Sequence, residues 1–388
     1  MMGTGDPILL VASDFVRTGG MDRANFALAQ YLANSGHEVH LAGFRAAADL
    51  TGLPNVSFHP AAKPLNSYFL GRTVLHRDGR RWASRIAARG GRVVVNGGNC
   101  RFGDVNWVHY VNAAYEPTAG RTPLRLWKLW THRAYLRDER EVLLSARVVI
   151  VNSDRTKCDV VKLLGVPAER VHRVYLGIDR DLFRPVSPAE RAAAKARMGW
   201  SSRPAIVFIG GLGDRRKGFD TLFEAWGRMA ADRSWSADLA VIGTGAEMPY
   251  WRDRTASAGL GDRIHFLGFR RDVPSVLAAC DAMIAPTRYE PYGMAVQEAL
   301  AMGIPALVSR SAGVSERYPG GLAELLIGDP EDPDELIERL RLWMARKAEY
   351  DVLTAALSDE MRSHTWDDMA REMMQIVHAD RETGRNAA

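Results

Sequence analysis

The 388-residue sequence predicts an α/β protein made of two doubly wound domains, each built on a parallel sheet. Short, continuously apolar runs alternate with amphipathic segments along the chain, which is typical of parallel strands covered by helices on both faces. The length suits two to three domains of about 150 residues each. Pro185 and Pro188 interrupt regular structure between the two halves, so we place the domain joint near residues 177–188.

The expected elements follow this alternation in order. In the first half a helix is expected over residues 20–35, where apolar residues recur near helical spacing and Gly36 then supplies a stop signal. A polar, alanine-rich helix over residues 188–198 opens the second half. The expected strands are 8–12, 38–42, 92–96, 105–109 and 148–152 in the first half, and 205–209, 238–242, 264–267, 282–285, 306–309 and 324–327 in the second.

Composition bounds the class of protein and its compartment. Hydrophobic residues make up 47% and charged residues 25%, which excludes a mainly disordered chain and a collagen-like or disulfide-stapled scaffold. The cysteines Cys100, Cys158 and Cys280 are far apart and suggest no disulfide framework. No basic segment precedes the first apolar run, and no run approaches the roughly 18 apolar residues of a membrane span. We therefore expect a cytoplasmic protein.

The most informative stretch is residues 285–305. A strand ends at Ala285, a loop follows, and a helix begins near Met294. Free N–H groups at a helix start, together with the positive end of the helix dipole, form an anion site suited to phosphate. Glu290 precedes this turn and Glu298 lies one to two turns into the helix. Two glutamates at this spacing around such a turn are uncommon by chance.

This stretch resembles the E-x7-E signature of retaining glycosyltransferases of the GT-B fold, specifically glycosyltransferase family 4, and residues 299–305 resemble the family's E-A-M-A-x-G-x-P run. The resemblance implies two Rossmann-like domains facing a central cleft. It also implies that Glu290 lies by the donor sugar and that Glu298 binds the ribose hydroxyls. The residues of the intervening turn that would contact the donor are Tyr292, Gly293, Met294, Ala295 and Val296.

The similarity covers nearly the whole chain, from about Ile8 to His378. Gly19 and Gly20 follow the first strand as the family's glycine-rich donor loop does. Residues 152–157, 164–167 and 174–179 resemble the end of the family's N-terminal domain, and the helix from residue 366 resembles its last helix. The implied domains are an acceptor-side domain over 1–180, a donor-binding domain over 181–365, and a helix plus tail over 366–388 that crosses back to the first domain.

Residues 210–220 resemble the family's phosphate loop, where an Arg and a Lys hold the donor diphosphate. Lys217 matches the family Lys, but the usual Arg is absent, since Gly211 or Leu212 occupies its place. Arg215 or Arg216 could supply the missing cation, because a guanidinium suits a diphosphate bidentately. The residue pattern leaves both candidates open.

Weaker matches complete the implied site. Gly243 lies in a loop that resembles the family's nucleotide-side G-x-G turn, and Arg270 lies in the region that contacts the nucleobase. His109 ends a strand at a position where the family often has a His beside the donor sugar; a buried core His is the alternative. The candidate acceptor contacts are Asn99, Tyr110 and Tyr115, with Asn112 between the two tyrosines.

Much of the net charge of +5 comes from two arginine-rich stretches of the first half. The second, residues 121–140, interleaves basic residues with Trp and Leu, a pattern that fits peripheral contact with the inner face of the cytoplasmic membrane or with an anionic acceptor. An ordinary helix with an apolar core face is the alternative. No nucleic-acid module is visible, so we expect no nucleic-acid partner. The basic residues are Arg72, Arg77, Arg80, Arg81, Arg85, Arg89 and Arg92, then Arg121, Arg125, Lys128, His132, Arg133, Arg137 and Arg140.

The resemblance implies a retaining transfer of a sugar from a nucleotide diphosphate sugar, with uridine the most frequent base in the family, to a glycan, lipid-linked or small-molecule acceptor. His109, Lys217 and Glu290 are the expected catalytic residues. No D-x-D motif stands at a strand end, so no metal or other cofactor is expected. The alternatives are a nucleotide-sugar epimerase or hydrolase of GT-B-like fold, or a non-catalytic sugar-nucleotide binding protein.

Overall fold

The computed structural model describes residues 6–116, 122–213, 215–232 and 234–386, with the side chains of 122–128 and 380–386 excepted. These residues form two compact units, which we describe separately. The first contains residues 6–116, 122–177 and 365–386, and the second is Ile178–His364. The last helix, α13 (Trp366–Asn386), packs against α1 (Gly20–Asn34) within the first unit.

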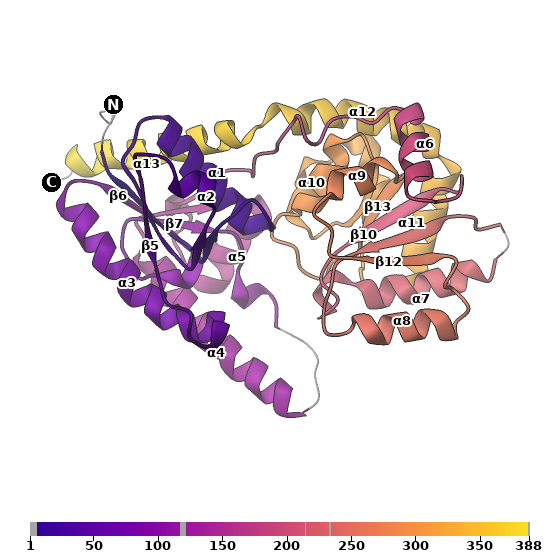
Figure 1. Cartoon of the computed structure of the whole chain (residues 1–388), viewed down its shortest axis with the longest axis horizontal. Coiled ribbons are helices and arrows are strands. Elements are labelled where there is room, and N and C mark those ends of the chain that lie inside the picture. Colours follow the sequence, from indigo (N-terminus) through magenta and orange to yellow (C-terminus); the bar gives the residue numbers. More distant parts are fainter. Residues whose placement is uncertain (1–5, 117–121, 214, 233, 387–388) are drawn as a thin grey trace. The chain divides into compact units, whose positions relative to one another are not determined.

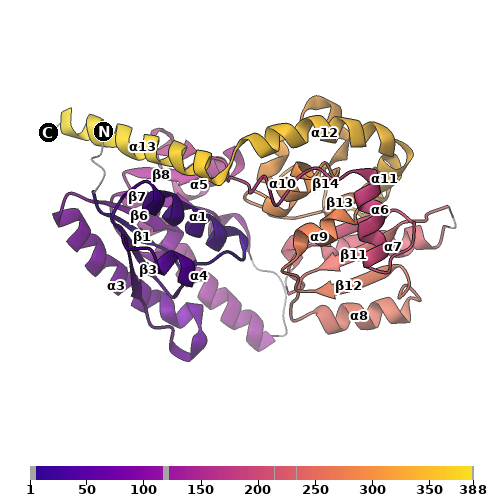
Figure 2. The same cartoon turned by 45° about the horizontal axis from the view of Figure 1, so that its top comes forward.

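The first unit is a parallel sheet with helices on both faces. Strands such as Ile8–Val11 and Val148–Val151 are entirely apolar and buried, because helices cover both sides of the sheet. In Figures 1 and 2, α1 and α13 lie on one face, and α3 (Tyr68–Ala88) and α4 (Thr122–Ser145) lie on the other. The strand order is β5 (Val56–Pro60), β3 (Val39–Gly43), β1 (Ile8–Val11), β6 (Arg92–Asn96), β7 (Val105–Val108), β8 (Val148–Val151) and β9 (Val171–Arg173). The smaller elements are β2 (Asp14–Phe15), β4 (Arg45–Ala46), α2 (Ala48–Thr51) and α5 (Asp154–Leu164).

The second unit repeats this architecture around a core that includes the fully buried Trp226 and Trp343. Helices α7 (Phe219–Ala230) and α8 (Met248–Ser257) lie side by side on one face, and α10 (Met294–Ala301) and α12 (Lys347–Ser363) pack together on the other (Figure 1). The strand order is β12 (Ile264–Gly268), β11 (Asp238–Ile242), β10 (Ala205–Ile209), β13 (Ala282–Ala285), β14 (Ala306–Ser309) and β15 (Leu326–Ile327). The helices are α6 (Pro188–Arg197), α7 (Phe219–Ala230), α8 (Met248–Ser257), α9 (Val273–Ala278), α10 (Met294–Ala301), α11 (Pro333–Ala345) and α12 (Lys347–Ser363).

The structure differs from the sequence-based prediction at three sheet edges. Strand β9, a three-residue strand at one edge of the first sheet, was not predicted. Strand β5 was not predicted, because it is an edge strand in which the exposed Ser57 and the partly exposed His59 break the apolar run. The strand predicted over 324–327 is wrong in its first half. Glu324 belongs to a short 3₁₀ helix, η7 (Gly320–Leu325), and only Leu326–Ile327 pair with β14. No helix in the described part of the chain is long and apolar enough to cross a bilayer.

Candidate functional site

Each sheet reverses its strand order beside its first strand, and ligands of open α/β sheets bind beyond the carboxyl ends of strands at such a reversal. In the second unit the reversal lies between β10 and β13. Residues 210–218 follow β10, and residues 286–293 follow β13. These two loops carry Lys217, Glu290 and both candidate arginines, Arg215 and Arg216. This edge of the second sheet is therefore the candidate donor site.

Glu290 and Lys217 form an ion pair at this edge, between Glu290 Oε2 and Lys217 Nζ. Arg216 approaches the same oxygen, with its Nη1 at 3.8 Å. Burial alone would raise the pKa of Glu290, but the charges of Lys217 and Arg216 and the hydrogen bond from Lys217 outweigh it and lower that pKa. Glu290 is therefore ionised at neutral pH and holds two cations where the sheet reverses.

Arg215 has a different partner. Its Nε donates to Asp220 Oδ2 at 2.6 Å, and Arg288 also donates to both carboxylate oxygens of Asp220. Of the two arginines that the sequence left open as a replacement for the usual family Arg, Arg216 is the one that lies beside Glu290.

The turn into α10 presents backbone amides at this edge. Gly293 adopts φ 114, and a Cβ there would lie 2.9 Å from Val314 Cγ1, so a side chain would be both strained and crowded. The Val296 N–H donates to the Gly293 carbonyl at 3.0 Å. The Met294 and Ala295 amides at the start of the helix have no place in its i to i−4 ladder and are the ones suited to an anion.

Two other residues of the motif are buried beside this turn. Tyr292 is 2% exposed, and its hydroxyl accepts a hydrogen bond from Arg317 Nη1 at 3.3 Å. Glu298 lies inside α10 and is 9% exposed. The tyrosine therefore contributes to the site through packing and its backbone.

A glycine joins the two loops of the site. Gly218 adopts φ 72, and a Cβ there would lie 1.8 Å from the Pro286 carbonyl oxygen. Gly218→Ala should therefore lower the unfolding free energy by more than the roughly 1–2 kcal/mol of left-handed strain alone. Gly199 is the matched control, because it has φ 68 and open space where its Cβ would be. Chemical denaturation measures both variants, and equal losses would contradict the close contact.

The loops after β11 and β12 lie along the same edge. The Gly243 N–H donates to the Gly268 carbonyl at 2.9 Å, which ties the two loops together. Arg270 pairs with Asp272 through two bonds of 2.8 and 2.6 Å. The neighbouring Phe269 is 63% exposed. Phe269 is thus the side chain in this loop that is open to a planar ligand, although the sequence prediction named Arg270.

In the first unit the predicted residues follow three neighbouring strands. Gly19 and Gly20 lie at the start of α1, beyond β1. Asn99 lies in the 3₁₀ turn η2 (Gly97–Asn99) directly after β6, and His109 directly follows β7. The strand order reverses between β1 and β6. These residues therefore share the carboxyl edge of the first sheet, where a ligand site is expected.

His109 is a buried imidazole, 8% exposed, whose ring packs on Trp107 with centroids 4.2 Å apart. Neither ring nitrogen has a hydrogen-bond partner among the described residues. Burial lowers the pKa of His109 to about 3, so the ring is neutral at physiological pH. A buried ring with unused nitrogens at a strand end is suited to a ligand hydroxyl.

The residues after His109 are arranged around a buried carboxylate. Asn112 donates to Glu139 Oε1 from its backbone N–H at 2.8 Å and from Nδ2 at 2.9 Å. This side chain is therefore engaged in anchoring the loop to α4. Tyr110 and Tyr115, the predicted acceptor contacts, are both partly exposed on either side of it.

The low pKa of His109 predicts how the unfolding free energy changes with pH. Its pKa of about 3 in the folded chain lies below the ordinary value of 6.5, so the unfolded chain takes up the proton first as pH falls. Between pH 7 and 5 the wild type should lose about 2 kcal/mol more unfolding free energy than His109→Gln. Denaturant unfolding at both pH values measures this. The difference between the two proteins cancels other titrating groups such as Asp22, and equal losses would contradict the burial.

Two protein-family models match the chain. A family model described as "Glycosyltransferase Family 4" matches residues 18–182, and one described as "Glycosyl transferases group 1" matches residues 203–345. Together they cover both units. The chain belongs to glycosyltransferase family 4.

Curated relatives of this family 4 chain match over part of their length. A mannosylfructose-phosphate synthase of Agrobacterium fabrum is 28% identical over 224 residues, which is 55% of this chain and 48% of the relative. The mannosyltransferase LpsB of lipopolysaccharide core biosynthesis, from Rhizobium meliloti, is 34% identical over 154 residues, 38% of this chain and 43% of LpsB. The matched segments thus span about half the length of these relatives.

Solved structures show the GT-B fold for the family 4 chain. Sucrose-phosphate synthase from Thermosynechococcus elongatus superposes with a TM-score of 0.79 at 20% identity, covering 97% of this chain and 100% of that one. WaaG, a glycosyltransferase of lipopolysaccharide biosynthesis, gives 0.78 at 19% identity, covering 95% and 99%. HepE from Anabaena, solved with UDP-glucose, gives 0.68 at 17% identity, covering 96% and 99%.

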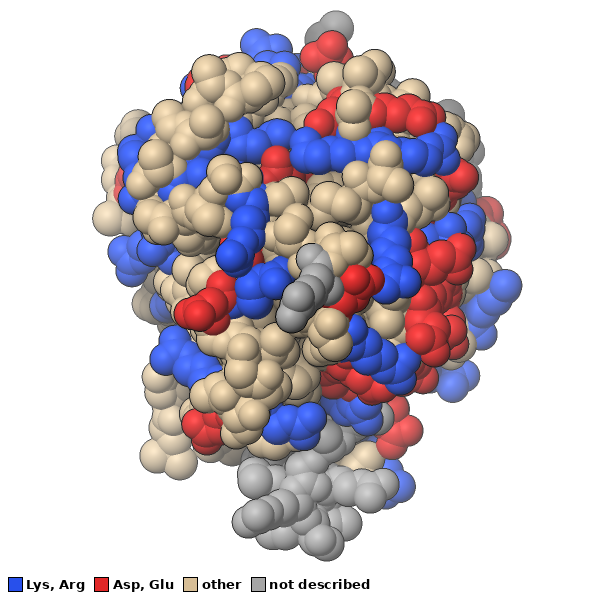
Figure 3. Space-filling model, turned by 90° about the vertical axis from the view of Figure 1, so that its right-hand side faces the viewer, with Lys and Arg blue, Asp and Glu red and all other residues tan. Residues whose placement is uncertain are grey.

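The arginine-rich stretches of the family 4 chain are partly neutralised. Arg72 pairs with Asp138, and Arg89 donates to both carboxylate oxygens of Glu38. Trp130 on α4 is 57% exposed. Residues 121–128 of the predicted membrane-facing helix lie outside the described side chains. Figure 3 views a different surface, that of the second unit, where Lys and Arg lie beside groups of Asp and Glu, so charge of one sign does not dominate on that face.

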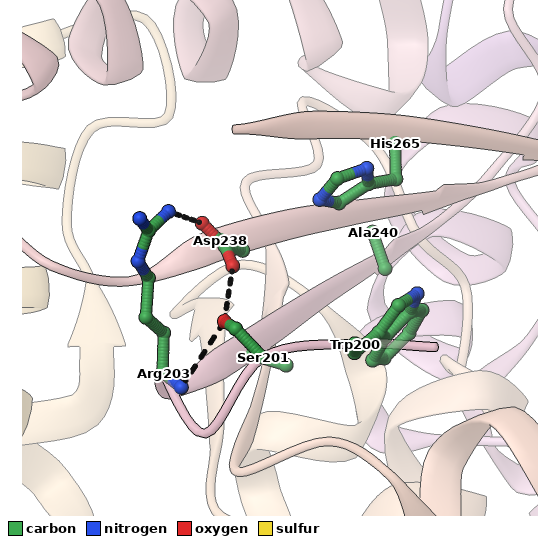
Figure 4. Close-up of a pocket in the computed structure, with 7 residues that line it drawn as sticks. Trp200, Ser201, Arg203, Asp238, Ala240 and His265 are labelled. Atoms are coloured by element: carbon green, nitrogen blue, oxygen red, sulfur yellow. Dashed lines mark hydrogen bonds and ion pairs between the residues drawn. The ribbon is translucent and has the colours of Figure 1, made fainter. Parts of the chain in front are cut away.

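A hollow at the other edge of the second sheet is drawn in Figure 4. Trp200 and His265 line one side, and Asp238 accepts hydrogen bonds from Ser201 and Arg203, each at 3.3 Å. Asp238 begins β11, so this hollow lies at the amino ends of the strands. Ligands of such sheets bind at the opposite edge, and we assign this hollow a structural role.

Sequence reasoning missed three residues near the donor site: Phe269, Arg288 and Arg317. Arg288 lies within residues 285–305, Phe269 lies next to Arg270, and Arg317 contacts Tyr292. None of the three occupies a defined position of a recognised motif. Their roles depend on exposure or on partners far along the chain, such as Asp220 for Arg288, which lies 68 residues away. A signal of charge alone could have flagged Arg288, two residues before Glu290.

Proposed function

We propose that this protein transfers a sugar from a nucleoside diphosphate sugar to a hydroxyl of an acceptor. The observation that carries the proposal is the pair of cations, Lys217 and Arg216, held by ionised Glu290 beside the start of α10. This group lies where the second sheet reverses its strand order. Membership of glycosyltransferase family 4 supports the same activity.

The cations suit the leaving group. Transfer breaks the bond between the anomeric carbon and a phosphate oxygen, and the electron pair departs with the diphosphate. Lys217, Arg216 and the amides of Met294 and Ala295 would stabilise that charge, a contribution in which a single donor accounts for about 100- to 1,000-fold in rate. Donor diphosphate would take Glu290's place as the partner of Lys217.

Retention of the anomeric configuration is part of the proposal. The acceptor oxygen forms its bond to the anomeric carbon on the face that the phosphate leaves, and its proton passes to a phosphate oxygen. No protein nucleophile is then required. Glu290 would orient the donor sugar, and the unused ring nitrogens of His109 would meet a sugar hydroxyl as a neutral imidazole.

We propose uridine as the base. Phe269 supplies an exposed aromatic ring at the carboxyl end of β12, and Glu298 would bind the ribose hydroxyls. HepE, a structural relative, was solved with UDP and with UDP-glucose, which supports this choice. No metal is proposed to take part, and transfer should continue in EDTA; loss of activity that returns with Mg²⁺ or Mn²⁺ would refute this.

The acceptor is proposed to be a glycan, a lipid-linked glycan or a small molecule, because curated relatives include an α-D-kanosaminyltransferase of Streptomyces kanamyceticus and the core mannosyltransferase LpsB. The protein would act in the cytoplasm, with peripheral contact at the inner membrane face through the basic helix. Exposed Trp130 supports such contact. Cosedimentation with anionic but not zwitterionic vesicles tests it.

A donor and acceptor screen followed by NMR tests the function. UDP, GDP and ADP sugars are each incubated with monosaccharide, polyol and lipid-linked acceptors. The expected result is release of nucleoside diphosphate that requires an acceptor, with the donor's α configuration retained in the product. An inverted product would refute retention. Free sugar or an epimer formed without acceptor would instead identify a hydrolase or an epimerase.

A further inference from the structure

Arg288 lies two residues before Glu290, with its side chain 11% exposed. Its guanidinium donates to both carboxylate oxygens of Asp220, at 2.8 and 3.0 Å, and to Thr221 Oγ1 at 3.1 Å. It also donates to Glu331 Oε1 at 2.7 Å and to the Arg215 carbonyl oxygen. Every N–H of the fork thus has an acceptor, so Arg288 is fully engaged within the protein.

These bonds join the two loops of the candidate donor site. Asp220 and Thr221 begin α7, directly after the loop that carries Lys217, whereas Arg288 belongs to the loop that carries Glu290. The backbone repeats the link, because the Arg288 N–H donates to the Arg216 carbonyl at 2.8 Å. The side chain of Arg216 donates in turn to the Tyr289 carbonyl at 3.0 Å. The two loops are therefore cross-linked from both sides.

Asp220 is the centre of this cross-link. Burial would raise its pKa, but the hydrogen bonds and charges of Arg288 and Arg215 prevail and lower it. The ionised carboxylate holds Arg215, which leaves Arg216 and Lys217 directed to Glu290. The Asp220–Arg288 pair thus determines which basic residues of the loop lie beside Glu290.

We propose that Arg288 is a positioning residue for the donor diphosphate. It acts through Asp220 and the backbone of the phosphate loop to hold Arg216 and Lys217 in register with Glu290, and it does not itself contact the donor. The proposal rests on the proposed function, since it assumes a nucleoside diphosphate at this site. A lysine could not replace the arginine, because an ammonium lacks the planar fork that spans Asp220, Thr221 and a carbonyl at once.

The test compares diphosphate with nucleoside binding. Dissociation constants for UDP and uridine, with the GDP and ADP pairs in parallel, are measured by calorimetry for the wild type, Arg288→Lys and Asp220→Asn. Both variants should weaken binding of the diphosphate by about tenfold or more, which corresponds to a loss of about 1.4 kcal/mol in binding free energy. Binding of the nucleoside should stay unchanged. A matched control is Glu331→Gln, which removes the negative charge of a 66% exposed partner of the same guanidinium and should bind like the wild type.

The outcomes separate this proposal from the proposed function. If the wild type binds no nucleoside diphosphate, the proposed function fails. If the wild type binds one and both variants bind it equally well, the positioning role is refuted. Equal losses of diphosphate and nucleoside affinity would refute it too, because they indicate general damage to the unit. Circular dichroism and melting temperature identify a variant that does not fold, and the other variant then decides.

Discussion

Replacing Glu290 with glutamine should lower the rate of sugar transfer by about 100-fold. The amide keeps the size of the side chain but loses the charge that would orient the donor sugar. Affinity for the nucleoside diphosphate should be unchanged or higher, because the carboxylate that pairs with Lys217 no longer competes with phosphate. Steady-state rates and calorimetric binding measure the two effects separately.

The charge-matched control for this variant is Glu224→Gln, on α7, whose side chain is 56% exposed and pairs with Arg228. It should transfer sugar at the wild-type rate. Full activity of Glu290→Gln would show that this carboxylate has no part in the reaction. A parallel loss in both variants would point to a nonspecific effect of removing negative charge from the unit.

Lys217→Met should reduce kcat/KM by about 100- to 1,000-fold and should also weaken binding of the diphosphate. Methionine has an unbranched side chain of similar length without the charge, so the change isolates the contribution of the ammonium group. Loss of the cation should also raise the pKa of Glu290, because the charge of Arg216 alone then offsets the effect of burial. Diphosphate affinity thus separates the two variants, since it falls for Lys217→Met and is maintained for Glu290→Gln.

Lys162→Met on the exposed side of α5 is the control for loss of a lysine. The double variant Lys217→Met, Glu290→Gln should lose less activity than the two single losses combined, because the side chains are in contact. Strict additivity would contradict a functional pair. Binding of UDP by Lys217→Met with wild-type affinity would also contradict the proposed role of this lysine.

Much of the fold could be predicted because buried parallel strands leave a direct mark on the sequence. Runs such as residues 205–209 and 239–242 are continuously apolar, and the structure forms strands there. Edge elements leave a weaker mark. Strand β5 alternates polar and apolar residues, and β15 has two residues, so neither shows a run that can be recognised.

The candidate site could be predicted only where its residues form a local pattern. Glu290 and Glu298 share one motif, and the family resemblance points to Lys217. The choice between Arg215 and Arg216 depends on Asp220, which draws Arg215 aside, and this is visible only in three dimensions. Arg288 has partners 43 to 73 residues away in the sequence, so no spacing rule could assign its role.

Binding of a nucleoside diphosphate tests the central claim most directly. Melting temperature is measured with UDP, GDP and ADP, and with the corresponding nucleosides, for the wild type and Lys217→Met. At a ligand concentration of about 100 times Kd, binding stabilises the folded state by about 2.7 kcal/mol, which corresponds to a shift of several degrees. The account predicts that at least one diphosphate, with UDP foremost, stabilises the wild type and stabilises the Lys217 variant much less. No shift with any diphosphate, or an equal shift in both proteins, would contradict it.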